Sequence, residues 1–320
     1  MSTDDNSPGT IVVALGGNAL SPAGQRATIH DQFHHTRESL GVVVSLAREG
    51  WRIAIVHGNG PQVGDELVRN EVAFDKVSPL PLGVLVAATA GWIGYMIQQS
   101  LQNALTRADI GREVLTVITQ TIIRKDDSRL SQATKPIGHA LTPETAERLN
   151  SRGTITGVDG SNRIRRLVPS PEPTGIAESP SVKQLVEAGK IVIAAGGGWP
   201  PVYLDESGRF EGIDAVVDKD RTAAIIGSRL NADVLLILTD VDGVYEGWGT
   251  DTSKRIDRLT LKEADRLLAS DQLGVGSMKP KVQAGVNFVR GGGKRAIIAE
   301  LERGLEAIRG ETGTSITGEN

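Results

Sequence analysis

Gly9-Thr-Ile-Val-Val-Ala-Leu-Gly-Gly-Asn-Ala-Leu20 is an apolar run that stops at Gly16, Gly17 and Asn18. Its β-branched residues predict a buried strand that ends in a tight loop. Two glycines allow backbone N–H groups to approach an anion closely, and an asparagine side chain can donate a further hydrogen bond. The end of this strand is therefore a candidate site for a phosphate or a carboxylate, although a simple turn would use the same residues.

The same arrangement recurs further along the chain. Apolar residues at three- and four-residue steps predict a helix over residues 36–49, and residues 52–56 predict a second strand. That strand ends in His57-Gly58-Asn59-Gly60-Pro61-Gln62-Val63-Gly64. A strand, a helix and a second strand favour a right-handed parallel crossover, which brings both glycine loops to one edge of the sheet.

Later segments continue the alternation of strands and helices. Residues 191–195 predict a strand that ends in Gly196-Gly197-Gly198, and residues 232–238 predict one that ends in Thr239-Asp240-Val241. The chain is thus predicted to have an α/β fold with a mainly parallel central sheet. Neither a Gly-x-x-x-x-Gly-Lys-Ser/Thr loop nor a Gly-x-Gly-x-x-Gly fingerprint follows the first strand, so a phosphorylated ligand must be held in another way.

Residues 122–178 differ in character because they are rich in proline, glycine, serine and charge. The segment from Pro143 has helical spacing, and residues 163–169 look like a half-exposed strand. A disordered insertion is one interpretation, and a small protruding subdomain is the one that we favour.

Composition narrows the class of protein. The chain has 320 residues, of which 39% are hydrophobic, enough for one large α/β domain with a flexible tail over residues 1–9. The net charge of −4 and the dispersed basic residues argue against nucleic-acid binding. The absence of cysteine excludes disulfides, thiolate metal sites and a cysteine nucleophile. The acidic N-terminus lacks a secretory pattern, so we expect a cytoplasmic protein.

One uncharged stretch, residues 80–97, is about long enough to span a bilayer. Prolines and glycines interrupt it, and glutamines follow it where basic anchors would be expected. A buried helix at a subunit interface is therefore the favoured interpretation. We expect no membrane association, and we expect a homodimer that buries part of this stretch.

Positive charge for a phosphoryl group could come from two places. Lys219 stands between Asp218 and Asp220 ahead of a predicted helix, and Lys279 and Lys281 lie at another junction of a turn and a helix. Lysines at such positions can neutralise the oxygens of a transferring phosphoryl group. The alternative is that Lys219 only pairs with its neighbours and that the other two lysines are solvated. His57 is predicted to be structural rather than a general base.

Taken together, the motifs resemble those of the carbamate kinase family, which has the amino-acid kinase fold. The matches run in order along nearly the whole chain: Ala14-Leu-Gly-Gly-Asn-Ala-Leu20, His57-Gly-Asn-Gly-Pro-Gln-Val-Gly64, Thr134-Lys-Pro-Ile-Gly138, Val168-Pro-Ser-Pro171, Ala195-Gly-Gly-Gly198, Val217-Asp-Lys-Asp220, Leu238-Thr-Asp-Val-Asp242 and Gly276-Ser-Met-Lys-Pro-Lys-Val282.

This resemblance implies a three-layer α/β/α sandwich formed by a single domain, residues 10–320. Residues 10–190 would form the acceptor-binding half, which includes the protruding subdomain at about 122–178, and residues 191–320 the nucleotide-binding half. It further implies a phosphotransferase of arginine metabolism that uses ATP or ADP with Mg²⁺ to act on carbamate or carbamoyl phosphate. No direct metal-binding motif is present, so the nucleotide phosphates would carry most of the Mg²⁺.

The resemblance also implies roles for particular residues. The acceptor and the phosphoryl group would be held by Gly16, Gly17, Asn18, Gly58, Asn59, Gly197 and Gly198. Lys135, Lys219 and Lys281 would supply positive charge, with Asp218 and Asp220 positioning them or the metal. The nucleotide site would be lined by Thr239, Asp240, Val241, Tyr245, Met278 and Lys279.

Two departures from the family pattern leave alternatives open. Trp199-Pro200-Pro201-Val202 replaces a fourth glycine, an aliphatic residue and Pro-Val, and Leu85, Ala88 and Ala90 replace a pattern of Cys, Met and Gln. We expect Trp199 to point outward against the protruding subdomain. An enzyme for another small carbamoyl or carboxyl acceptor, or a non-catalytic metabolite sensor, remains the alternative.

Overall fold

A mainly parallel sheet forms the centre of the protein. The computed structural model describes residues 8–16, 20, 28–196, 199–270, 272–273 and 278–318. Within these residues the sheet has eight strands in the order β15-β17-β16-β12-β1-β2-β9-β3. All neighbouring strands are parallel except β16 and β17. The strands are β1 (Thr10–Leu15), β2 (Arg52–His57), β3 (Val114–Thr116), β9 (Ile191–Gly196), β12 (Val234–Thr239), β15 (Arg258–Thr260), β16 (Arg295–Glu300) and β17 (Thr314–Thr317).

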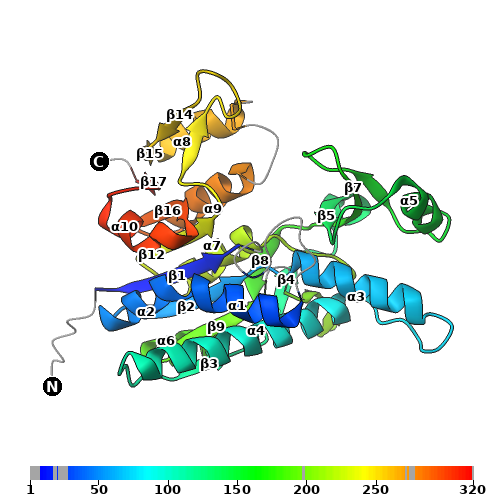
Figure 1. Cartoon of the computed structure of the whole chain (residues 1–320), viewed down its shortest axis with the longest axis horizontal. Coiled ribbons are helices and arrows are strands. Elements are labelled where there is room, and N and C mark those ends of the chain that lie inside the picture. The colour runs from blue at the N-terminus through cyan, green and yellow to red at the C-terminus, as the bar shows by residue number, and fades with distance from the viewer. Residues whose placement is uncertain are drawn as a thin grey trace.

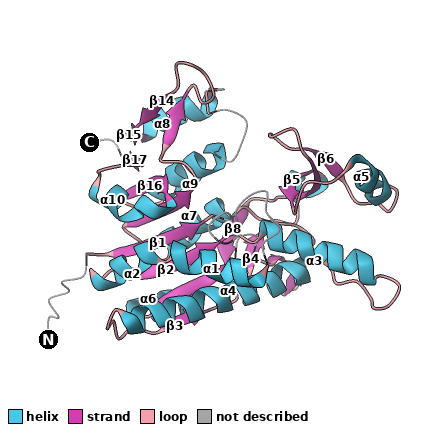
Figure 2. Cartoon of the chain, in the orientation of Figure 1, coloured by secondary structure: helices cyan, strands magenta, loops and turns pink. Residues whose placement is uncertain are grey.

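Both faces of this sheet are buried, as side-chain alternation along β1 shows. Ile11, Val13 and Leu15 belong to one hydrophobic cluster, whereas Val12 and Ala14 belong to the other. The first cluster includes residues of α2 (Gly41–Arg48), α4 (Leu82–Arg107) and α10 (Gly304–Arg309), and Phe33 of α1 (Ile29–Ser39) packs against it. The second includes residues of α6 (Ser179–Glu187), α7 (Lys219–Arg229), α8 (Leu261–Ala269) and α9 (Met278–Arg290). The predicted three-layer α/β/α architecture is confirmed, and in Figure 2 helices α1, α2 and α4 pass in front of the strands.

Two predicted elements are divided in the structure. The single helix expected over residues 36–49 is two helices, α1 and α2, which meet at Leu40. The first begins earlier than expected because Thr28 and Asp31 form a capping box at its N-terminus. Residues 114–121 form a β-branched run whose sequence predicts one strand, but the run contributes to β3 and to β4 (Thr121–Ile123), which belong to different sheets.

A smaller sheet projects from the body and is shown in green at the right of Figure 1. It consists of β5 (Ala133–Ile137), β6 (Thr156–Val158) and β7 (Ile164–Pro169), with α5 (Pro143–Asn150) beside it. We call residues 133–169 the arm. The ends of the 122–178 segment lie elsewhere, because β4 and β8 (Pro173–Ile176) pair with each other in a four-stranded sheet with β10 (Pro201–Leu204) and β11 (Phe210–Gly212).

The base of the arm lies against α3 (Gly60–Ala73) with very close backbone packing. A Cβ atom added to Gly64 would lie 2.0 Å from the Cα atom of Gly138, and the Gly138 N–H donates to the Gly60 carbonyl at 3.2 Å. Gly138 has φ of +71°, a conformation that glycine adopts without strain. Glycine is therefore required on both sides of this contact.

The uncharged stretch that raised the membrane question forms α4, a helix of 26 residues. Ile93, Ile97 and Leu101 are buried against the sheet, whereas Val84 and Tyr95 are exposed. In the described part of the chain, no helix combines the length and apolarity needed to cross a membrane.

Candidate functional site

The polar strand ends lie side by side at one edge of the sheet. Leu15 pairs with His57 on one side and with Leu238 on the other, and His57 pairs with Gly196. The carboxyl ends of β1, β2, β9 and β12 therefore lie next to one another, as the parallel alternation predicts. Gly16, Gly58, Asn59 and Thr239 are at this edge. Gly17, Asn18, Gly197 and Gly198 lie outside the described residues.

The N-terminus of α7 supplies a second part of the site. Asp218 is the N-cap residue, and its Oδ1 atom accepts from the backbone N–H groups of Asp220 at 3.0 Å and Arg221 at 3.4 Å. This cap fixes the first turn of the helix, on which Lys219 and Asp220 lie. The N-terminus of a helix carries a partial positive charge that favours anions.

Five charged side chains form one cluster around this turn. Lys135 from β5 lies 2.8 Å from the carboxylate of Asp218, and Lys281 from α9 lies 3.1 Å from that of Asp220. Lys219 also pairs with Asp220. Three ammonium groups therefore face two carboxylates, which leaves one net positive charge. The residues derive from the arm, the start of α7 and α9, and the direct pair of Lys135 and Asp218 joins positions 83 residues apart in the sequence.

Burial and charge together set the protonation of this cluster. Burial opposes ionisation of Asp218, but the charges of Lys135, Lys219 and Lys281 outweigh it and hold the pKa of that carboxyl well below its usual range. Burial likewise opposes the charge on Lys281, yet Asp220 and Asp218 raise the pKa of its ammonium group. Burial lowers the pKa of Lys219, against the attraction of Asp220. The arrangement is suited to binding a phosphoryl group, whose oxygens carry negative charge.

The two lysines of the 276–282 motif differ in their surroundings. Lys281 is buried and paired, whereas Lys279 is exposed. The interpretation that both are merely solvated is therefore wrong for Lys281.

Buried polar groups line the site next to β2. Burial lowers the pKa of His57 to about 4, so its imidazole is neutral at neutral pH. The Nδ2 atom of Asn59 donates to the hydroxyl of Thr89 on α4 at 3.0 Å. Thr89 was not singled out by the sequence, because it lies in an apolar stretch 30 residues from Asn59.

On the other side of the site, the candidate nucleotide residues follow β12. The hydroxyl of Thr239 donates to Asp240 at 3.0 Å, and the hydroxyl of Tyr245 donates to Asp242 at 2.8 Å. Arg255, which sequence reasoning missed, also donates to Asp242 at 3.0 Å. Tyr245 and Arg255 lie on a hairpin formed by β13 (Val244–Glu246) and β14 (Lys254–Ile256). Val241 is half-buried, and Met278 packs partly buried against the core.

The expected outward orientation of Trp199 is wrong. Its side chain has 0% exposure and belongs to the hydrophobic cluster that contains Val56, Ile176 and Val182. Burying the indole removes a large apolar surface from water, and this hydrophobic gain favours the inward position over the outward one. Of the other departures, Leu85 and Ala90 are buried and Ala88 is exposed.

Comparison with known proteins agrees with this geometry. The model of the amino acid kinase family matches residues 9–300. A carbamate kinase from Pyrococcus horikoshii is 41% identical over 313 residues, which cover 97% of this chain and 99% of the relative. One from Halobacterium salinarum is 42% identical over 307 residues, or 95% of this chain and 97% of the relative.

Solved structures agree as well. Carbamate kinase from Giardia lamblia bound to citric acid aligns with a TM-score of 0.92 and 31% identity, over 97% of this chain and 99% of that one. The same enzyme bound to AMP-PNP aligns with a TM-score of 0.88 and 32% identity over the same shares. The chain therefore belongs to the amino acid kinase family, and within that family to the carbamate kinases.

Proposed function

We infer that the protein transfers a phosphoryl group between ATP and carbamate, giving ADP and carbamoyl phosphate. The observation that carries this inference is the identity of about 40% to curated carbamate kinases over nearly the full chain. The cluster of three lysines and two aspartates at the sheet edge supports it. The transfer is reversible, and the experiment that tests it follows the direction of ATP synthesis.

The proposed chemistry needs no general base. A carboxylate oxygen of carbamate attacks the γ-phosphorus, the new O–P bond forms as the bond to the β,γ-bridging oxygen breaks, and ADP takes that electron pair. Because carbamate is already an anion, no proton has to be removed from it. The neutral His57 is consistent with a structural role.

We propose that Lys135, Lys219 and Lys281 neutralise the charge of the transferring group, and that Asp218 and Asp220 position these lysines. The acceptor and the phosphoryl group are assigned to the loops after β1, β2 and β9, with the residues Gly16, Gly17, Asn18, Gly58, Asn59, Gly197 and Gly198. The nucleotide is assigned to the other half of the sheet edge, with the residues Thr239, Asp240, Val241, Tyr245, Met278 and Lys279.

Mg²⁺ is part of the proposal, since it neutralises phosphate charge in phosphoryl transfer. The described residues contain no group of three or more His, Cys, Asp or Glu side chains arranged to hold a metal ion. Asp218 and Asp220 already pair with ammonium groups, and Mg²⁺ commonly takes its ligands from substrate phosphates and water. We therefore propose that the nucleotide phosphates carry the metal.

We also propose a cytoplasmic homodimer. Strand β3 ends the central sheet, and beside it a hollow of about 360 Å³ is lined by residues of α4 and by Thr116. Tyr95 and Ile118 are exposed in this region, at 56% and 52%. An uncharged surface that exposes apolar side chains next to a sheet edge suits contact with a second copy of the chain.

The test of the proposed function is an assay with ADP, Mg²⁺ and carbamoyl phosphate in which ATP formation is followed. We expect ATP to form in proportion to enzyme. A panel of small carboxylic and carbamoyl acids, each tested with ATP, examines the alternative acceptors. Activity on a panel member without activity on carbamate would show that the acceptor is a different acid. No activity on any of these compounds would favour a non-catalytic sensor.

A further inference from the structure

The arm presents one face to the body, and Lys135 belongs to that face. In the antiparallel pair of β5 and β7, Lys135 lies opposite Val168, and Ile137 lies opposite Arg166. Residues directly opposite each other, and residues two apart in one strand, share a face of a sheet. Ile137, Val168 and Arg166 have exposures of only 1%, 9% and 3%, so this inner face is packed against other elements.

The apolar part of the inner face packs against two helices. Ile137 and Val168 form a small hydrophobic cluster with Val63 of α3 and Val86 of α4. This contact holds the arm by burial of apolar surface, which has no directional preference. It does not by itself fix how far β5 is shifted or rotated over α3.

A directional contact lies next to that cluster. The Nη2 atom of Arg166 donates to both carboxylate oxygens of Glu71 on α3, at 2.8 Å each, and its Nε atom donates to one of them at 3.2 Å. Planar contacts of this kind fix both distance and orientation. The pair joins residues 95 positions apart and adds a charged contact with α3 to the backbone hydrogen bond from Gly138 to Gly60.

We propose that Arg166 and Glu71 are positioning residues for Lys135. This inference rests on the proposed function, in which Lys135 supplies charge to the transferring phosphoryl group. Ile137, opposite Arg166, is two residues from Lys135 on the same strand, so the pair sets where the Lys135 ammonium group stands relative to α7. The 2.8 Å contact between Lys135 and Asp218 depends on that placement.

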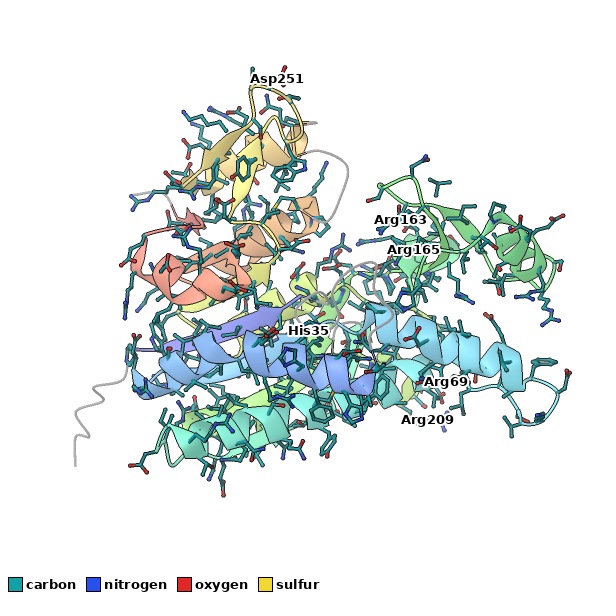
Figure 3. All side chains as sticks on the ribbon, in the orientation of Figure 1. His35, Arg69, Arg163, Arg165, Arg209 and Asp251 are labelled. Atoms are coloured by element: carbon teal, nitrogen blue, oxygen red, sulfur yellow. The ribbon has the colours of Figure 1, made fainter. Side chains whose placement is uncertain are left out.

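The arm offers a matched control for a purely structural effect. Arg163 pairs with Asp159 at 3.2 Å within the arm and is 47% exposed. Figure 3 labels Arg163 and Arg165 on the arm. Replacing Arg163 by methionine removes an arginine of the same subdomain without touching α3.

The experiment compares Arg166→Met, Glu71→Gln, Arg163→Met, Lys135→Ala and the double variant Arg166→Met/Lys135→Ala. We expect Arg166→Met and Glu71→Gln to lower kcat about 10-fold or more, because small displacements of a reacting constellation are costly. Lys135→Ala should lower it about 10²-fold. The KM for ADP should stay within about twofold of wild type, since neither Arg166 nor Glu71 is among the residues assigned to the nucleotide, and Arg163→Met should keep wild-type kcat.

The double variant decides whether Arg166 acts through Lys135. If it does, adding Arg166→Met to Lys135→Ala lowers kcat no further, whereas independent effects multiply. The inference would be overturned if the effects of Arg166→Met and Lys135→Ala on kcat multiplied in the double variant. It would also be overturned if Arg166→Met and Glu71→Gln both kept wild-type kcat while Lys135→Ala was inactive. Wild-type kcat in Lys135→Ala would instead overturn the proposed role of Lys135. Glu71→Gln keeps the shape of the pair, so it carries the test if circular dichroism shows that Arg166→Met does not fold.

Discussion

Lys219 lies in a place where burial opposes its charge and lowers the pKa of its ammonium group. Its ammonium group is balanced by Asp220 and lies in the first turn of α7, where phosphate charge is favoured. We predict that Lys219→Ala lowers kcat by about 10²-fold or more, because one charge contact to the transition state is lost. Nucleotide affinity should change less. Steady-state ATP formation measures kcat and the KM for ADP, with Lys262→Ala at an exposed position as the control. Near-normal turnover in Lys219→Ala would show that Lys219 has no role in the mechanism.

A second prediction at this scale concerns His57. Its pKa is about 4 in the folded protein because of burial, against 6.5 in an unfolded chain. Between these values the unfolded chain binds the proton and the folded chain does not. The free energy of unfolding therefore falls as pH falls from 6.5 towards 4, by up to about 3 kcal/mol.

His57→Leu should remove that part of the pH dependence. Urea unfolding at pH 7 and pH 4.5 measures it, and His34→Leu on the exposed side of α1 should retain the wild-type dependence. An unchanged slope in His57→Leu would show that other groups cause the acid sensitivity.

Trp199 leads to a prediction about stability. Since its side chain is completely buried in the core, Trp199→Ala should lower the free energy of unfolding by about 3–5 kcal/mol. Trp248 is 52% exposed and packs edge-on against Tyr245, so Trp248→Ala should change it by only about 1 kcal/mol or less. Chemical unfolding followed by circular dichroism compares the two. Equal effects would contradict the burial of Trp199.

At the scale of the elements, much of the fold was predictable from the sequence. Strands buried on both faces read as continuous apolar runs, and the glycines after them mark where each strand ends. The division of the 36–49 helix at Leu40 was not predicted, because the apolar spacing continues across the break, and a single glycine, Gly41, does not by itself end a helical pattern. Nor did local sequence separate β3 from β4, which join different sheets.

The contact of α3 with the base of the arm leads to a prediction about these elements. Gly64→Ala would place a Cβ atom 2.0 Å from the Cα atom of Gly138, so the arm must move away from α3. We expect a loss of about 1–3 kcal/mol in the free energy of unfolding, together with lower kcat. Gly41→Ala is the control, since nothing lies within 4 Å of its added Cβ. Unfolding curves and turnover that match wild type in Gly64→Ala would contradict the close packing.

At the scale of the whole molecule, the site contains a contact that the spacing of residues in the sequence does not predict. Asp218, Lys219 and Asp220 are adjacent in sequence, so their grouping was visible. Lys135 reaches Asp218 only because a strand of the arm turns back over the sheet edge, and spacing carries no sign of that contact. The resemblance to carbamate kinases indicated Lys135 as a site residue, whereas only the structure shows that it pairs with Asp218.

The homodimer is the prediction for the whole molecule. Light scattering should give about twice the chain mass of 33.9 kDa at micromolar concentration. Tyr95→Glu or Ile118→Asp should shift the mass towards one chain, because each places charge on the exposed surface beside β3. Phe210→Asp, on the exposed β11 strand, should leave the mass unchanged. A wild-type monomer would contradict the proposed assembly.

The contrast in burial between Trp199 and Trp248 gives the chain an optical signal of its own. An indole in apolar surroundings emits at shorter wavelengths than one in water, and a water-soluble quencher such as acrylamide reaches only the second kind. With Trp51 and Trp92 replaced by phenylalanine, the two remaining tryptophans would lie after β9 and on the β13–β14 hairpin. Their emission would then report separately on the segment after β9 and on the β13–β14 hairpin in one cuvette, without an attached dye.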